Sequence, residues 1–143
     1  MTSINQNTAI EDTLKNWSDA ISNKNAQSTL SYLTEDIVEF SLAPPLQYRG
    51  KDAEGIQSWF DSWTGPIGNE SRELDITASD DVAFARCLVR MTGTKTTGDK
   101  ADLWFRQTLG LIKQGGIWKI AHVHASVPFY MDGSFRAAID LKP

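Results

Sequence analysis

The sequence has little cysteine, no long apolar run and no cluster of basic residues. Cys87 is the only cysteine among 143 residues, which excludes an internal disulfide, and its apolar neighbours predict a small buried side chain. No stretch approaches the ~18 consecutive apolar residues of a membrane-spanning helix. The 14 Lys and Arg residues are scattered among 18 Asp and Glu residues. This distribution disfavours nucleic acid and membrane surfaces as partners, because neither would meet a basic patch.

Residues 1–7 are polar and contain no apolar segment typical of a signal peptide. We therefore expect a cytoplasmic protein. A hydrophobic content of 41% is ordinary for a globular protein. Because no repeat or linker divides the chain, we predict one domain over residues 1–143.

Helices are predicted in three segments of the first 65 residues. Thr8 and Glu11 have the spacing of a capping box and would begin the first helix. Its apolar face carries Ile10, Leu14, Trp17 and Ile21. The second helix would carry Ala26, Leu30 and Leu33 and end before Asp36. The third would run from Gly50 to Gly65–Pro66, with Ile56, Trp59, Phe60 and Trp63 on one face.

Strand patterns follow these helical segments. Residues 37–42 alternate, with Val38, Phe40 and Leu42 on one face and Ile37, Glu39 and Ser41 on the other. Pro44–Pro45 would end this strand, and residues 46–48 would return beside it. Four further strands are predicted over residues 72–78, 82–93, 101–113 and 117–127. Their short connections favour antiparallel hairpins.

Helices followed by a meander of strands predict an α+β fold. The helices must cover one face of the sheet, since their apolar stripes need a partner. We expect a cystatin-like cone, in which three N-terminal helices pack on a strongly curved, mainly antiparallel sheet. A cavity at the mouth of the cone is where a small molecule would bind. Trp59 would either pack in the core or line that cavity.

The last predicted strand carries two histidines, His122 and His124, whose side chains share one face. Trp118, Ile120 and Ser126 would lie on the same face, which we expect to face the helices. Three roles fit the histidines: structural imidazoles, pocket groups that bind or exchange a proton with a ligand, and metal ligands. Because a zinc site needs at least a third protein ligand and no motif supplies one, we predict neither a metal nor a cofactor.

The hairpin around Gly115–Gly116 decides which neighbours the histidines have. A regular hairpin places Gln107, with Phe105 and Leu109, on the face of the histidines and Arg106 on the opposite face. One β-bulge reverses this assignment. Both Gln107 and Arg106 are therefore kept as ligand-binding candidates.

Arg90 lies in an apolar strand and needs an acidic partner or water. It would form a structural ion pair, with Glu39 as the candidate partner, or clamp the carboxylate of a ligand. Tyr48 would contribute a hydroxyl group at the cavity mouth or lie on the surface.

The segment 116–128, GIWKIAHVHASVP, resembles the last strand of nuclear transport factor 2-like (NTF2-like) proteins. The resembling branch contains SnoaL-like and ketosteroid isomerase-like proteins and the association domain of calcium/calmodulin-dependent protein kinase II. That association domain has the same G-x-W-x-I-x-H-x-H-x-S pattern, and a strand similar to Val89–Thr92. The element order extends the resemblance over nearly the whole chain, and it implies the cone-shaped fold.

Departures from these relatives limit what the resemblance implies about function. Ketosteroid isomerases place an aspartate that acts as general base where this chain has Ser41. Their general-acid tyrosine in the first helix has no counterpart, since the first tyrosine here is Tyr32. The association domain lines its pocket with arginines, of which Arg90 is retained, whereas Leu109 and Ala125 replace the others. Neither steroid isomerisation by that mechanism nor an identical anion pocket is expected.

The resemblance and the polar residues together predict a SnoaL-like small-molecule-binding protein or enzyme of the isomerase, cyclase or lyase type. Its cavity would be polar and aromatic, and whether it is catalytic stays open. The candidate ligand-binding residues are Glu39, Tyr48, Trp59, Arg90, Arg106, Gln107, His122 and His124. The alternative is a non-catalytic association module. In either case we expect a homodimer with a small-molecule ligand and no nucleic-acid or membrane partner.

Overall fold

The computed structural model describes residues 2–143, with side chains from Gln6 onward. Within that range it contains three helices and six strands, and their order fits the α+β prediction. The elements are α1 (Thr2–Ser22), α2 (Ala26–Ser31), β1 (Leu33–Phe40), β2 (Tyr48–Arg49), α3 (Ala53–Asp61), β3 (Trp63–Ala78), β4 (Val82–Lys95), β5 (Lys100–Gln114) and β6 (Ile117–Ser126).

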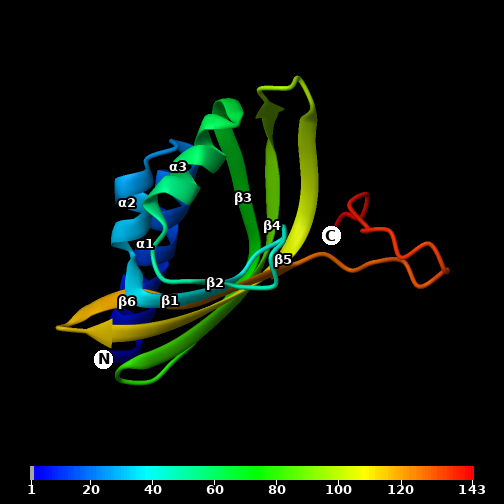
Figure 1. Ribbon diagram of the computed structural model, residues 1–143. Helices are drawn as coiled ribbons and strands as arrows, with labels where there is room; N and C mark the ends of the chain where they lie inside the picture. Colours follow the sequence, from blue (N-terminus) through cyan, green and yellow to red (C-terminus); the bar gives the residue numbers. More distant parts are fainter. Residues whose placement is uncertain (1) are drawn as a thin grey trace.

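The strands form one mixed sheet in the order β2-β1-β6-β5-β4-β3, and the helices cover one of its faces (Figure 1). Neighbouring strands are antiparallel except β1 and β6, which are parallel. Short turns connect β3 to β4, β4 to β5 and β5 to β6, as predicted. The parallel pairing brings β1, the first strand, beside β6, the last. We call the helix-covered face the inner face and the opposite face the outer face.

Helix α1 packs its predicted apolar stripe against the inner face. Ile10, Leu14 and Trp17 are buried in the main core cluster, together with side chains from β1, β4, β5 and β6. The helix begins at Thr2, so the capping box predicted at Thr8 does not mark its start. Cys87 belongs to the same cluster, as predicted, and burial raises the pKa of its thiol.

The two shorter helices begin at side-chain caps. The side chain of Asn25 accepts a hydrogen bond from the Ser28 amide at 3.0 Å, and Asp52 accepts one from Gly55 at 2.9 Å. Such caps satisfy amides that have no partner within the helix. They explain why α2 and α3 start one residue after a polar side chain.

Trp63 begins β3 instead of ending the third helix, although it fits the helical spacing. Strand β3 is at the edge of the sheet, so Pro66 can lie in it without removing a hydrogen bond to a second neighbour. The helix stop predicted at Gly65–Pro66 is therefore wrong, because the helix already ends at Asp61. Beneath α3, Phe60, Trp63 and Ile67 pack as a second core cluster.

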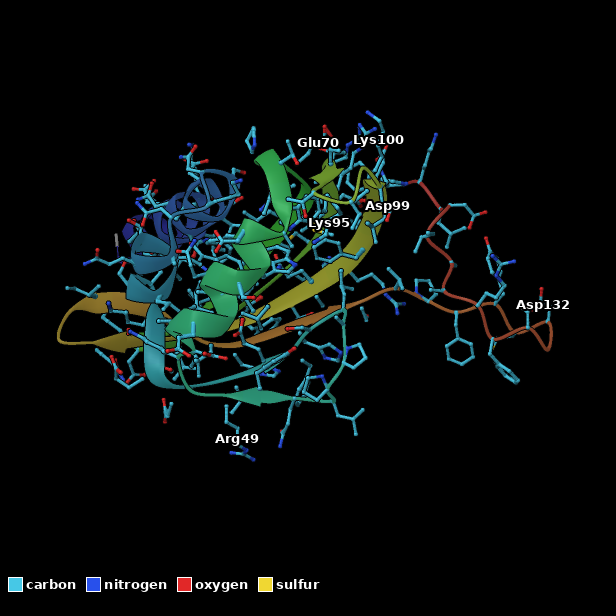
Figure 2. The ribbon with its side chains drawn as sticks, turned by 45° about the horizontal axis from the view of Figure 1, so that its top comes forward. Arg49, Glu70, Lys95, Asp99, Lys100 and Asp132 are labelled. Carbon is cyan, nitrogen blue, oxygen red and sulfur yellow. The ribbon has the colours of Figure 1, made fainter. Side chains whose placement is uncertain are left out.

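The chain after β6 forms a C-terminal tail that extends away from the helices, with Asp132 near its far end (Figure 2). Hydrogen bonds from the Tyr130 amide to the Arg136 carbonyl and from the Ala138 amide to the Pro128 carbonyl, both 2.8 Å, hold it as a hairpin. No helix in residues 2–143 has the length and apolar character to cross a membrane.

Candidate functional site

Strand β6 contains a β-bulge at Ala121. Ile120 pairs with Leu111, and His122 pairs with the preceding residue of β5, Gly110. Ala121 therefore has no partner on β5. An extra residue in one strand turns every side chain beyond it to the other face of the sheet.

The bulge places both histidines on the outer face. Before it, Trp118 and Ile120 are buried, at 4% and 0% exposure. Beyond it, Val123 is buried whereas His124 is exposed. The prediction that the histidines face the helices together with Trp118 and Ile120 is therefore wrong, because β6 is interrupted by the bulge.

The same bulge decides between Arg106 and Gln107. Arg106 pairs with Ser126 and lies on the outer face beside His124, whereas Gln107 pairs with Ala125 and faces the helices. The regular-hairpin assignment is wrong, and the alternative with one bulge is confirmed. The two candidates thus belong to opposite faces of the sheet.

The histidines are held at the junction of β1 and β6. His122 Nδ1 donates a hydrogen bond to the Val38 carbonyl oxygen at 2.7 Å, which leaves Nε2 of the neutral ring as an acceptor. The ring of Phe40 contacts His122 and His124 edge-on, with ring centroids 4.7 and 5.3 Å apart. The pair therefore combines one anchored imidazole with one exposed imidazole.

A pocket of about 790 Å³ adjoins these residues, between the β1–β2 connection and the end of β6. We call it the loop pocket. Its lining residues are Phe40, Ser41, Leu42, Ala43, Pro44, Pro45, Leu46, Gln47, His124, Ala125, Ser126 and Val127. Apolar walls with a few polar groups are typical of small-molecule sites, and this volume lies within their usual range.

Glu39 lies on the inner face near the loop pocket. It pairs with Val123, two residues before the pocket residue Ala125, and Gln107 lies opposite Ala125. Burial raises the pKa of the Glu39 carboxyl, and nearby His122 opposes this shift. None of the residues that the structure describes forms a hydrogen bond or ion pair with this carboxyl.

Arg90 is not near Glu39, because the two side chains lie on opposite faces of the sheet. Its guanidinium group forms a bidentate pair with Asp102, at 2.8 and 2.9 Å, and Asp102 has a lowered pKa for this reason. The predicted ion pair with Glu39 is therefore wrong, whereas a structural ion pair for Arg90 is confirmed. The pair leaves Arg90 occupied and away from the loop pocket.

Tyr48 and Trp59 lie in different places. Tyr48 donates a hydrogen bond from its hydroxyl to the Pro44 carbonyl at 2.9 Å, which braces the connection that forms the loop pocket. Trp59, on α3, is 39% exposed and contacts the rings of Phe60 and Trp63. Tyr48 thus supports a wall of the loop pocket without lining it, and Trp59 does not line it.

A second pocket of about 760 Å³ lies between α2 and α3 and is lined mainly by short and polar side chains. None of the predicted site residues lines it. Within the described part of the chain, no group of three or more His, Cys, Asp or Glu side chains is placed to hold a metal ion.

Sequence reasoning missed the residues of the β1–β2 connection as pocket walls. The sequence predicts Leu42 in a strand, Leu46 in a segment that returns beside it, and the proline pair only as the end of that strand. What reveals them is the parallel register between β1 and β6, which places residues after Phe40 beside residues after His124. That register is a tertiary feature.

Comparison with known families fits this architecture. A model of the SnoaL-like domain matches residues 10–130, from the buried face of α1 to the start of the C-terminal tail. The chain belongs to the SnoaL-like family. This family is part of the NTF2-like superfamily, as the resemblance implied. A search of curated proteins gives no match.

Solved structures of this SnoaL-like protein's relatives share its fold. An NTF2-like protein of unknown function from Pseudomonas putida KT2440 is 29% identical, with a TM-score of 0.85 over 95% of each chain. A ketosteroid isomerase-like protein from Erwinia carotovora atroseptica is 25% identical, with a TM-score of 0.71 over 83% of this chain and 93% of that one. The association domain of C. elegans calcium/calmodulin-dependent protein kinase II is 17% identical, with a TM-score of 0.70 over 87% and 98%, a likeness of fold alone.

Proposed function

We propose that this protein binds a small organic molecule in the loop pocket and exchanges a proton with it through Glu39. The observation that carries the proposal is the half-buried Glu39 carboxyl, which makes no hydrogen bond or salt bridge within the described chain and lies next to the pocket residue Phe40. A carboxyl group in such surroundings is destabilised in its charged form. A ligand that supplies a hydrogen-bonding group would offset this.

The chemistry follows from the raised pKa of Glu39. A carboxyl with a raised pKa is partly protonated closer to neutral pH, so it can donate a proton to a carbonyl oxygen or accept one from an adjacent carbon. Gln107, opposite Ala125, would orient the ligand through its amide. This role fits the isomerase, cyclase or lyase types of reaction that the SnoaL-like resemblance suggests.

Saturation-transfer NMR with cyclohexanone, acetophenone and 2-naphthol tests binding. We expect transfer to at least one probe, and loss of transfer in Ala43→Trp, which fills the loop pocket from its exposed wall. Ala53→Trp, in the α2–α3 pocket, is the matched control and should retain binding. Equal loss in both variants, or no transfer in the unmodified protein, would contradict the proposal.

Proton exchange tests the role of Glu39. We expect the protein to accelerate deuteration of the α-carbon of bound cyclohexanone or acetophenone in D₂O, and Glu39→Gln to abolish this acceleration while binding persists. Deuteration that continues in Glu39→Gln would assign the proton transfer to another residue.

The second candidate function is an association module that forms a homodimer. The outer face supports it. Val82 and Phe84 are 55% and 50% exposed on the same face as Arg86 and Arg72, and Arg72 stacks on Trp104 at 4.9 Å. Arginine and aromatic residues are enriched at protein interfaces. Light scattering after size exclusion would show a dimer at micromolar concentration that Phe84→Glu dissociates, and a monomer in the unmodified protein would rule this out.

A further inference from the structure

Arg106 differs from the other arginines on β3, β4 and β5 because no acidic residue that the structure describes pairs with it. Arg72, Arg86 and Arg90 each form an ion pair with a carboxylate, at 3.6, 3.1 and 2.8 Å. Within the described part of the chain, Arg106 makes one hydrogen bond, to Ser126 Oγ at 3.2 Å. Among the described residues, no carboxylate therefore neutralises its positive charge.

Ser126 connects Arg106 to the loop pocket. Its oxygen accepts a hydrogen from the guanidinium group, which leaves the hydroxyl hydrogen available for another acceptor. Ser126 lines the pocket, and so does His124. Their side chains share the outer face two residues apart, roughly 6.6 Å along the strand, so both can approach one small group.

His124 adds a third donor at this end of the pocket. Its contacts in residues 2–143 are with the rings of Phe40 and His122, and no hydrogen bond occupies its nitrogens there. A neutral imidazole has one N–H, and a protonated one has two. His124 and Ser126 thus present an imidazole and a hydroxyl in the pocket lining, and the guanidinium group of Arg106, which is not itself a lining residue, reaches the pocket through Ser126.

Apart from Ser41 and Gln47, the remaining walls of the loop pocket are apolar, and its lining residues include no acidic side chain. A guanidinium group matches the two oxygens of a carboxylate with two N–H donors. We infer that the ligand carries a carboxylate on an apolar body, with the carboxylate held by Arg106, Ser126 and His124. The inference rests on the proposed function, because it names the ligand class of the same pocket.

Paired probes test this inference. Benzoate and hexanoate differ from benzamide and hexanamide in charge but hardly in shape, and dissociation constants for all four are measured by NMR titration. We expect each acid to bind about tenfold more tightly than its amide, as the loss of a charge-assisted hydrogen bond predicts. Inorganic phosphate should not displace the acids, because it lacks the apolar body.

Two variants connect the preference to one arginine. Arg106→Gln should remove the preference for acids while amide binding persists. Arg86→Gln, an exposed arginine of the same face that already pairs with Asp75, is the matched control and should keep the preference. Thermal unfolding confirms that both variants fold.

The outcomes separate this inference from the proposed function. Equal binding of acids and amides, or equal loss in both variants, would overturn the carboxylate assignment and leave the pocket as a ligand site. Absence of binding by all four probes, together with the three neutral probes above, would overturn both. Displacement of benzoate by inorganic phosphate alone would show an anion site without the apolar subsite and would also overturn the ligand class.

Discussion

The two halves of β6 continue the same alternation of residues along the chain but place it in opposite surroundings. Before Ala121, Trp118 and Ile120 point into the core. After it, the residues in the same alternation, His122 and His124, point away from the helices, and Val123 takes the core position. One residue without a partner therefore separates a stretch that stabilises the fold from a stretch that borders a pocket.

This difference shows that a bulge alone can move side chains from the core to the face that borders a site, with no change in the amino acids themselves. Because side chains alternate with a period of two, a single extra residue reverses a whole segment. The first half of β6 should then respond to substitution through stability, and the second half through ligand binding. Four experiments break or sharpen this contrast.

Deletion of Ala121 should have the largest effect. Without the extra residue, His122 and His124 would turn toward the core and Val123 would turn out of it. Burying imidazoles that have no partners and exposing apolar side chains should lower the free energy of unfolding by more than about 4 kcal/mol, or prevent folding. Circular dichroism during urea unfolding measures this, and Ala121→Ser, which keeps the residue count, should fold normally. A deletion variant as stable as the unmodified protein would show that the bulge is dispensable.

Ile120→Ala tests the core half directly. The side chain is fully buried, so its truncation should lower the free energy of unfolding by about 2–5 kcal/mol. Urea unfolding with a constant m-value measures this cost. A loss below about 1 kcal/mol would contradict the tight packing assigned to this half.

Glu39→Gln tests the pocket side through pH. Burial raises the pKa of Glu39 above its ordinary value of 4.5, so the folded state binds more protons than the unfolded chain above that pH. The stability of the unmodified protein should therefore decline as the pH rises from 4.5 through the folded pKa, and Glu39→Gln should lack this component. We expect the variant to be the more stable of the two at pH 7, by less than the Ile120→Ala effect. The contribution is disproved if the two unfolding profiles stay parallel across this range.

His124→Gln should have the smallest effect on stability. The imidazole is exposed and makes no hydrogen bond within the described chain, so the free energy of unfolding should change by about 0.5 kcal/mol or less. Binding of benzoate should nevertheless weaken. His122→Gln is the useful comparison. Unlike His124, His122 donates a hydrogen bond to the Val38 carbonyl, so its replacement should lower the free energy of unfolding more.

Much of the fold could be predicted from the sequence because local periodicity records which face of each element is buried. The stripe Ile10, Leu14 and Trp17 packs as expected, and the turns between the last four strands lie where glycine and polar residues cluster. Boundaries were less predictable: Trp63 satisfies both a helical spacing and a strand, and pairing with Lys95 of β4 places it in β3. The strong curvature of the sheet and the homodimer remain predictions.

The candidate site was predicted only as a set of residues. Of its members, only His124 lines the loop pocket. The others near it, Glu39, Tyr48, Arg106, Gln107 and His122, lie on both faces of the neighbouring strands, whereas Arg90 and Trp59 lie elsewhere. The error over Arg90 has a physical cause, since an arginine in an apolar strand needs an acidic partner and several were available. Only strand register shows that Asp102 shares its face and Glu39 does not.

The sequence by itself determined the class of fold, the helical faces, the order of the strands along the chain and the family, because each of these depends on neighbours a few residues apart or on a continuous motif. Only the tertiary structure decided which face carries the histidines, which acid pairs with Arg90 and that the β1–β2 connection walls a pocket. These features depend on one bulge and on a parallel pairing between residues more than 80 positions apart. Local sequence periodicity contains no information about either.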